Sequence, residues 1–546
     1  MSQLTFQERQ PRAADSTLDR ALEEFAAAVG REHVITSASA LNEAGKATFA
    51  TSQAPAAIVR PADRSQVQAC VRIANRVGIS LYPISSGKNW GYGSRVPTAD
   101  GAILLDLGRM NRIVDFSEEL AYATVEPGVT QRQLQDFLKK RGSHLMMDVT
   151  GASPDCALIG NTLERGFGHT PYGDHFAQVC GLEVVLPDGE CVETGFARFD
   201  GAKAAALNRW GLGPVLDGLF SQSNLGIVTR MTVWLMPAPE YFQSFCCRCD
   251  GEEGIAALID ALRPLRLNGT LRSTVHIGND YKVISAIRQY PWEEMGGETP
   301  LGGPVLAKLR KQFNVGSWNA SGGLYGTRAQ VAEARRLLRR ALRGKVDKLQ
   351  FLDERMVRIA ARFARPYRWF TGWDLSRTLE LLRPVLGLMQ GVPTEHPLSS
   401  AYWRKRAAPP VQMNPDRDGC GLLWCSPIAP ATGGHALELT RIACKVLLEH
   451  RFEPAISISM VSERSLACVI SITYDRNVPG EDERAAQCHD ELKKRLAEKG
   501  YYPYRLDIRS MGAMQGQPAY TGLLRNLKRA LDPANVLSPG RYIPGA

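Results

Sequence analysis

The stretch that decides the fold reads Pro83-Ile-Ser-Ser-Gly-Lys-Asn-Trp-Gly-Tyr-Gly93, and it continues the strand pattern Ile79-Ser-Leu-Tyr-Pro-Ile84. Small residues let backbone N–H groups turn inward and approach a ligand closely, as an anion such as a diphosphate requires. Trp90 and Tyr92 are too large for a simple turn. A loop that cradles phosphates and also presents aromatic rings predicts that a cofactor and a substrate meet there.

Two familiar phosphate-binding motifs do not fit this loop. A nucleoside-triphosphate loop needs Ser or Thr after its Gly-Lys and a Gly five residues before that Gly, but here Asn89 follows Lys88 and Tyr82 holds the earlier place. No Gly-x-Gly-x-x-Gly opens a helix after a strand. The strand at 56–59 and the helix predicted over 64–77 instead make a β-α-β unit that ends in the loop.

Length and composition limit the class of protein. At 546 residues the chain exceeds one ordinary core, so we expect two domains. It is 44% hydrophobic and 22% charged, as soluble globular proteins are. No run reaches the length of a membrane span, and the N-terminal residues lack a basic-then-apolar layout. We expect a cytoplasmic protein that does not bind a membrane.

The net charge of +10 raises the alternative of nucleic-acid binding. The densest basic run, 335–343, carries Leu337, Leu338 and Leu342 at helical spacing, so its arginines form the solvent-exposed face of an amphipathic helix. An anionic cofactor or substrate accounts for excess basicity equally well. The 12 cysteines are scattered, and Cys246-Cys247-Arg-Cys249 has no matching ligand pair, so we expect reduced thiols and no metal site.

The remaining sequence divides at Met236-Pro-Ala-Pro239. Before it, periodicity predicts helices over 16–29 and 131–140, strands over 101–107 and 121–125, and a hairpin over 181–194. Beyond it helix and strand come in longer blocks, at 254–262, 328–343, 436–449, 455–460, 467–474 and 481–499. Residues from Tyr501 onward, with a helix over 522–531, are expected to return to the first domain.

Several further stretches carry a family resemblance when taken together and in order. They are Val125-Glu-Pro-Gly128, Ile159-Gly-Asn161, Glu164-Arg-Gly166, Thr170-Pro-Tyr-Gly-Asp-His175, Phe220-Ser-Gln-Ser-Asn-Leu-Gly-Ile-Val-Thr229, Tyr504-Arg505 and Asp532-Pro-Ala-Asn-Val-Leu-Ser-Pro-Gly540. With the opening loop, they make the protein resemble the vanillyl-alcohol oxidase and p-cresol methylhydroxylase family of FAD-dependent oxidoreductases, from about Ile58 to Pro544.

The resemblance implies an α+β fold with an FAD-binding PCMH-type domain over 1–238, an α+β cap over 239–499 that covers the flavin ring, and a C-terminal return over 500–546. It also implies a homodimer. The residues expected to bind FAD are Ser85, Ser86, Gly87, Lys88, Asn89, Gly151, Ile159, Gly160, Asn161, Thr170, Tyr172, Gly173, Gly226, Ile227, Val228 and Arg541.

In phenol-oxidising members, two tyrosines and an arginine bind the substrate as phenolate, and the matching positions are Tyr92, Tyr504 and Arg505. A permanent cation and two O–H donors favour the anion of a phenol whose pKa is near 10. The phenolate eases hydride transfer from the benzylic carbon to flavin N5, and the resulting quinone methide is hydrated or the product eliminates. O2 or a separate electron-acceptor protein then reoxidises the flavin.

Three departures from the family pattern separate this protein from the oxidisers of simple para-alkylphenols. Leu422 stands where covalent members carry a flavin-linking His, so we expect FAD without a covalent bond. The usual acidic residue near N5 falls on Gly151 or Ala152, which leaves Asp155 as a substitute, and His169 replaces a family aromatic. His169 could act as a base or hydrogen-bond donor near neutral pH, or it could be a structural histidine, and both interpretations stay open.

The alternatives are an FAD enzyme that oxidises a non-phenolic alcohol or amine in a biosynthetic pathway, a flavin-binding protein without turnover, and the basic nucleic-acid binder.

Overall fold

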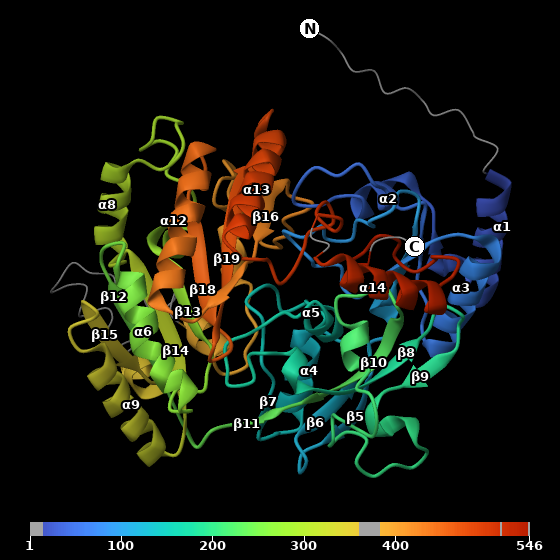
Figure 1. Cartoon of the computed structure of the whole chain (residues 1–546), viewed down its shortest axis with the longest axis horizontal. Helices are drawn as coiled ribbons and strands as arrows, with labels where there is room; N and C mark the ends of the chain where they lie inside the picture. Colours follow the sequence, from blue (N-terminus) through green and yellow to red (C-terminus); the bar gives the residue numbers. More distant parts are fainter. Residues whose placement is uncertain (1–14, 360–382, 514–515, 544–546) are drawn as a thin grey trace, which may run out of the picture.

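The computed structural model describes residues 15–359, 383–513 and 516–543. Two units lie side by side in it, one built on small sheets and one on a single large sheet (Figure 1). In the first unit a four-stranded sheet has the order β1 (Val34–Ile35), β2 (Ala57–Val59), β4 (Ile103–Asp106), β3 (Leu81–Ile84). Helices α1 (Asp15–Val29), α2 (Ala38–Ala44) and α3 (Arg64–Val77) belong to this part of the protein.

The β2-α3-β3 unit forms as its residues predict. The Asp63 carboxylate accepts a hydrogen bond from the Gln66 N–H and caps α3, and Gly78 ends the helix in the left-handed conformation. Strands β2 and β3 both pair in parallel with β4. The strand carrying the loop is also held by the C-terminal return, because Leu81 N donates to Val536 O at 2.7 Å.

A five-stranded antiparallel sheet completes the first unit, in the order β5 (Ile113–Ser117), β6 (Tyr122–Val125), β10 (Ile227–Trp234), β8 (Val179–Val185), β9 (Cys191–Glu193). Strands β7 (Leu145–Met146) and β11 (Met236–Pro237) pair separately. Helices α4 (Gln131–Lys140), α5 (Leu158–Leu163) and α14 (Pro518–Leu531) complete the described helices of this unit.

The second unit is organised by an eight-stranded antiparallel sheet whose strands all come from 241–475. Its path is β15 (Lys348–Leu352), β12 (Tyr241–Cys249), β14 (Trp318–Gly326), β13 (Val275–Asn279), β18 (Ala455–Met460), β19 (Ser465–Asp475), β16 (Cys420–Cys425), with β17 (Ile428–Pro430) on β19. One face packs against α6 (Gly254–Leu267), α9 (Arg328–Leu342), α12 (Gly433–Glu449) and α13 (Glu481–Glu498) in one large apolar core (Figure 1). Helices α7 (Asp280–Ile287) and α8 (Gly303–Phe313) follow β13.

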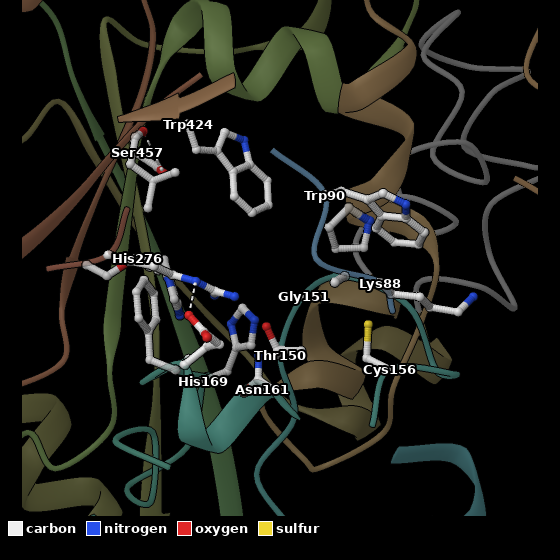
Figure 2. Close-up of a pocket in the computed structure, with 18 of the residues that line it drawn as sticks. Lys88, Trp90, Thr150, Gly151, Cys156, Asn161, His169, His276, Trp424 and Ser457 are labelled. Carbon is white, nitrogen blue, oxygen red and sulfur yellow. Dashed lines mark hydrogen bonds and ion pairs between the residues drawn. The ribbon is translucent and has the colours of Figure 1, made fainter. Parts of the chain in front are cut away.

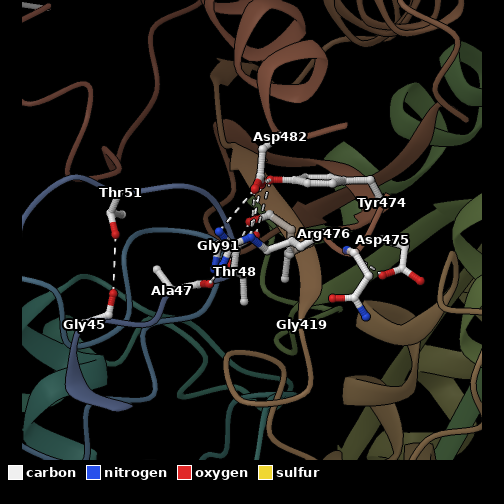
Figure 3. Close-up of polar contacts among 12 residues, drawn as sticks. Gly45, Ala47, Thr48, Thr51, Gly91, Gly419, Tyr474, Asp475, Arg476 and Asp482 are labelled. Atoms are coloured by element: carbon white, nitrogen blue, oxygen red, sulfur yellow. Dashed lines mark hydrogen bonds and ion pairs between the residues drawn. The ribbon is translucent and has the colours of Figure 1, made fainter. Parts of the chain in front are cut away.

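Polar contacts join the two units at β16 (Figure 3). Thr48 Oγ1 donates to Leu422 O at 2.8 Å and accepts from Gly91 N at 3.0 Å. Arg476 Nη1 donates to Ala47 O at 2.8 Å, and its guanidinium pairs with Asp482. The first unit's loop after β3 is therefore tied to a strand of the large sheet.

The helices over 131–140 and 64–77 begin and end where the sequence predicts, and the block over 455–460 forms strand β18 with the same bounds. Helix α5 and the central strand β14, which reads Trp-Asn-Ala-Ser-Gly-Gly-Leu-Tyr-Gly, are not among the predicted elements. Gly322 and Gly323 are poor strand formers, but a Cβ there would stand 2.8 Å from the Phe245 ring and 2.5 Å from the Tyr325 ring. Among the described helices none is long and apolar enough to cross a membrane.

Candidate active site

A cavity of about 1080 Å³ lies between the two units and is lined by both. Figure 2 shows Lys88, Trp90, Gly151 and Cys156 on one side of it, with His276, Ser457 and Trp424 of the large sheet facing them. Most of the predicted site residues line this cavity: Ser85, Ser86, Gly87, Lys88, Asn89, Tyr92, Gly151, Ile159, Gly160, Asn161, His169, Gly226, Ile227, Val228, Tyr504, Arg505 and Arg541. Thr170, Tyr172 and Gly173 do not.

Those three residues lie behind the wall. Thr170 donates through both its N–H and its hydroxyl to Asp148, at 2.7 Å and 2.5 Å. A Cβ on Gly173 would stand 2.2 Å from Thr274 Oγ1, so this glycine serves close packing between the units. Through Asp148, Thr170 helps to fix the segment that carries His169.

Where the loop after β3 lines the cavity, the first unit's wall is made of backbone. Gly87 has a φ of +68°, and the N–H groups of Gly87, Lys88 and Asn89 have no acceptor within the described residues. The start of α5 supports this loop, because Ala157 N donates to Ser86 Oγ at 3.1 Å. Free amides on a turn with positive φ form a concave anion site, which fits a diphosphate.

A buried ionic cluster closes the inner end of this wall. Glu164 pairs with Arg541 and with Arg505, whose Nε lies 3.3 Å from Glu164 Oε2. Burial alone would raise the pKa of Glu164, but the two guanidinium groups outweigh it and lower the pKa. One carboxylate against two arginines leaves one positive charge in excess, which favours an anion beside the cluster.

Tyr92 and Tyr504 stand beside this excess charge. The Arg505 guanidinium lies 4.3 Å from the centroid of the Tyr92 ring, and Tyr92 Oη lies 2.6 Å from Ser426 Oγ. Burial raises the pKa of Tyr92 and of Tyr504. Both tyrosines therefore keep their protons at neutral pH and can donate hydrogen bonds to an anion.

His169 and His276 line the cavity near Gly151 (Figure 2). Their ring centroids are 4.2 Å apart, and His276 Nδ1 lies 2.9 Å from Ser459 Oγ. Burial lowers the pKa of both, that of His276 to about 4, so both rings are neutral at pH 7. A Cβ on Gly151 would stand 3.3 Å from His169 Nε2. His169 thus borders the space into which an acidic residue at this position would extend.

His276 escaped the sequence analysis because a single histidine in a strand carries no motif. Only recognition of β13, with its alternation of buried and half-buried residues, could have placed it on the cavity face.

Trp90, which had no role in the sequence analysis, anchors the loop. Its Nε1 donates to Asp416 Oδ2 at 3.0 Å, and Ser94 Oγ donates to Asp416 Oδ1 at 2.6 Å. Burial raises the pKa of this carboxyl to about 7. The contact is a second link between the loop and the large-sheet unit.

Other residues at or near the family departures lie away from the cavity. Asp155 pairs with Arg132 at 2.9 Å and is not part of the wall. Leu422 packs in a small apolar cluster with Trp90 and Tyr402. Cys425 lies in the core of the large sheet, where burial raises the pKa of its thiol to about 12. The described residues hold no cluster of metal-ligating groups.

Comparison with known proteins agrees with this geometry. The family model of the FAD binding domain matches residues 55–195. The sequence is 32% identical to the 4-cresol dehydrogenase (hydroxylating) flavoprotein subunit of Pseudomonas putida, over 96% of this protein and 95% of that one. The chain belongs to the p-cresol methylhydroxylase family of FAD-dependent oxidoreductases.

Its cofactor is therefore FAD. The crystal structure of p-cresol methylhydroxylase with substrate bound superposes with a TM-score of 0.86 at 30% identity, covering 97% of each protein. A second relative in this family is 49% identical over 96% of this protein and 97% of its own length: the 1'-carboxy-chondrochloren decarboxylase of Chondromyces crocatus.

Proposed function

We propose that this FAD-dependent oxidoreductase oxidises the benzylic carbon of a para-substituted phenol. The observation that carries the proposal is the meeting of Tyr92, Tyr504 and Arg505 at the inner end of the cavity. Two O–H donors and an excess positive charge in a place shielded from water favour a phenolate over a phenol. FAD, when bound, supplies the acceptor for a hydride.

Each residue of the trio has a distinct part. Arg505 supplies charge and is held by Glu164 and by Asn89, whose Oδ1 accepts from Arg505 Nη2 at 2.5 Å. Tyr92 and Tyr504 fix the direction of the phenolate oxygen. Negative charge on that oxygen raises electron density at the para carbon, so the benzylic C–H bond gives up its hydride more easily, and the substrate becomes a quinone methide.

We propose further that the quinone methide collapses by losing CO2 when the neighbouring carbon bears a carboxylate. The C–C bond to the carboxylate breaks, its electron pair forms a new C=C bond next to the ring, and the ring regains a phenolate. Phenol-CH2-CHR-COO⁻ then yields phenol-CH=CHR, CO2 and a transferred hydride. O2 or a separate electron acceptor takes the two electrons from the flavin afterwards.

Two observations support decarboxylation over hydration. Hydration needs a base that activates water. The position expected to carry an acidic residue falls on Gly151 or Ala152, and burial holds the pKa of His169 beside Gly151 well below its ordinary value, which makes this imidazole a weak base. The 49% identical relative is by its name a decarboxylase of a carboxylated compound. A carboxylate at position 151 would also repel the substrate's own.

The test is an anaerobic single turnover of the holoenzyme with 3-(4-hydroxyphenyl)propanoate. We expect the flavin to bleach and 4-vinylphenol and CO2 to form in equal amounts. An alcohol without CO2 would overturn the decarboxylation and keep the oxidation. Bleaching by aliphatic alcohols or amines but not by phenols would establish the non-phenolic alternative.

We also infer that FAD is held without a covalent bond and that residues 239–499 act as its cap. Leu422 and Cys425, the residues nearest the expected linkage position, lie off the cavity. Acid precipitation should release the flavin into the supernatant. Flavin that stays with the pellet would contradict the inference.

A further inference from the structure

Lys282 places a positive charge in the wall of the cavity. It lies in the first turn of α7, which starts directly after β13, where Asn279 caps the helix. Within 15–359, 383–513 and 516–543 the Lys282 ammonium makes no ion pair, and its contact is with Ser471 Oγ at 3.5 Å. Burial, with no opposing carboxylate, lowers its pKa to about 8. An unpaired buried charge is costly and is a reason to look for a missing anion.

The large sheet presents a polar, carboxylate-free face around this lysine. The strand register aligns one row of residues across the sheet: Lys348, Arg248, Asn319, Gly278, Ser457 and Val469. All of them line the cavity. Among the described residues the one acidic group in the whole wall is Glu164, which belongs to the first unit and is neutralised by two arginines. An anion entering along this row meets no repulsive charge.

Lys282 is also placed within reach of the reacting end. Ser471, its contact, lies directly opposite Trp424 on the neighbouring strand. The Trp424 ring in turn packs edge-on against the Tyr92 ring, with centroids 5.4 Å apart. Neighbouring strands are about 4.8 Å apart. A short substituent that starts from a ring at Tyr92 and passes Trp424 therefore ends near Lys282.

The helix face that carries Lys282 suits such a substituent. Val283, Ala286 and Ile287 line the cavity with it. These positions share one side of a helix, because residues three and four apart are neighbours. A single ammonium at the edge of an apolar strip matches an alkyl substituent that ends in, or carries, one anionic group.

We propose that Lys282 binds the carboxylate of the substrate and so selects phenols whose para substituent is anionic. This rests on the proposed function for the identity of the ring, but not for the recognition of the anion. Lys282 holds the carboxylate in place before oxidation. Lys282 positions the substrate and sets specificity, while Tyr92, Tyr504 and Arg505 activate the phenol.

The experiment compares a carboxylate with its primary amide in compounds that cannot be oxidised. Two methyl groups on the benzylic carbon of 3-(4-hydroxyphenyl)propanoate remove the hydrogens that would leave as hydride. Binding of this acid and of its amide to the holoenzyme is followed by the change in flavin absorbance. We expect the wild type to bind the acid at least tenfold more tightly than the amide, as a charge-assisted contact provides.

In Lys282→Met the acid-over-amide preference should fall to about onefold, and Lys282→Arg should keep most of it. Lys308→Met is the matched control, because Lys308 pairs with Glu294 on the surface of α8 and does not line the cavity. Its preference should equal that of the wild type. FAD content and Tm of each variant show whether it folds.

A preference that survives in Lys282→Met, or a wild type without any preference, would overturn the proposal. An equal loss of affinity for acid and amide would make Lys282 a packing residue and overturn it as well. If the preference depends on Lys282 but oxidisable phenols do not bleach the flavin, the carboxylate site stands and the proposed oxidation fails.

Discussion

The two walls of the cavity bind by different means. The loop after β3 in the first unit offers backbone: free N–H groups on Gly87 to Asn89, supported by the start of α5. The second unit's wall offers side chains, among them His276 and Trp424 of the large sheet and Lys282 of α7. Backbone amides suit an invariant group such as a diphosphate, whereas side chains can differ between relatives with the substrate. The comparison predicts that cofactor binding and substrate choice can be disturbed separately.

Arg505→Ala is expected to separate substrate oxidation from cofactor binding most strongly, because it removes the charge that holds a phenolate. We expect the rate of flavin reduction by phenols to fall by about 10²–10³-fold, as when a group that stabilises developing charge is lost. FAD content should stay near that of the wild type. Rapid anaerobic mixing measures the rate.

The control for Arg505→Ala is Arg509→Ala. Arg509 is a nearby arginine that pairs with Asp490 and does not line the cavity. Equal losses in the two variants would mean that Arg505 acts through folding alone.

Gly87→Ala should disturb the loop after β3 instead. A Cβ on Gly87 would stand 2.3 Å from Arg95 Cγ, and its φ of +68° strains any other residue. We expect FAD affinity to fall roughly tenfold or more, since about 1.4 kcal/mol of distortion gives a factor of ten. Titration of apoprotein with FAD measures it.

Gly78→Ala is the matched variant for that titration. Gly78 has nearly the same φ, +69°, but nothing within 4 Å of the added Cβ and no place in the cavity wall. It should lose stability and keep FAD affinity. If both variants bind FAD alike, the loop does not hold the cofactor.

Tyr504→Phe is a smaller test of the substrate end. It removes one O–H donor and leaves Arg505 in place, so we expect about a tenfold loss in the reduction rate with phenols. The effect should be absent with any non-phenolic compound that reduces the flavin. A reduction rate equal to that of the wild type would exclude Tyr504 from phenolate binding.

The smallest effect concerns Asp416, which joins the two walls. Its pKa is raised from 3.8 to about 7, so the folded state holds a proton that the unfolded state releases. The stability that this carboxyl group contributes is fully present below the unfolded pKa of 3.8 and is lost as the pH rises toward the folded pKa of about 7. Between pH 6 and 8 the free energy of unfolding should fall by about 1.4 kcal/mol more in the wild type than in Asp416→Asn. Denaturant titrations at both pH values measure the difference, and parallel losses would contradict it.

The same contrast explains what the sequence could predict. The loop after β3 is encoded in a glycine- and serine-rich run that is local in the sequence, and Ser85 to Asn89, Gly160 and Arg541, which are predicted to bind FAD, all line the cavity. The opposite wall is assembled from strands far apart in sequence. His276 and Lys282 become neighbours of the loop only through the register of β13 with β14 and β18.

Thr170, Tyr172 and Gly173 show what the sequence does not predict. They lie in a motif-rich run, yet their neighbours turn them away from the cavity. The spacing of glycines and aromatic residues indicates a bend in the backbone, but it does not say which residues of the bend face a ligand.

The most direct test of the central claim compares 4-ethylphenol with its methyl ether in anaerobic flavin bleaching. Methylation keeps the ring and the benzylic hydrogens but prevents formation of the phenolate. The account predicts that the phenol bleaches the flavin and that the ether does not do so at a measurable rate. Comparable bleaching by the ether would contradict a phenolate held by Tyr92, Tyr504 and Arg505.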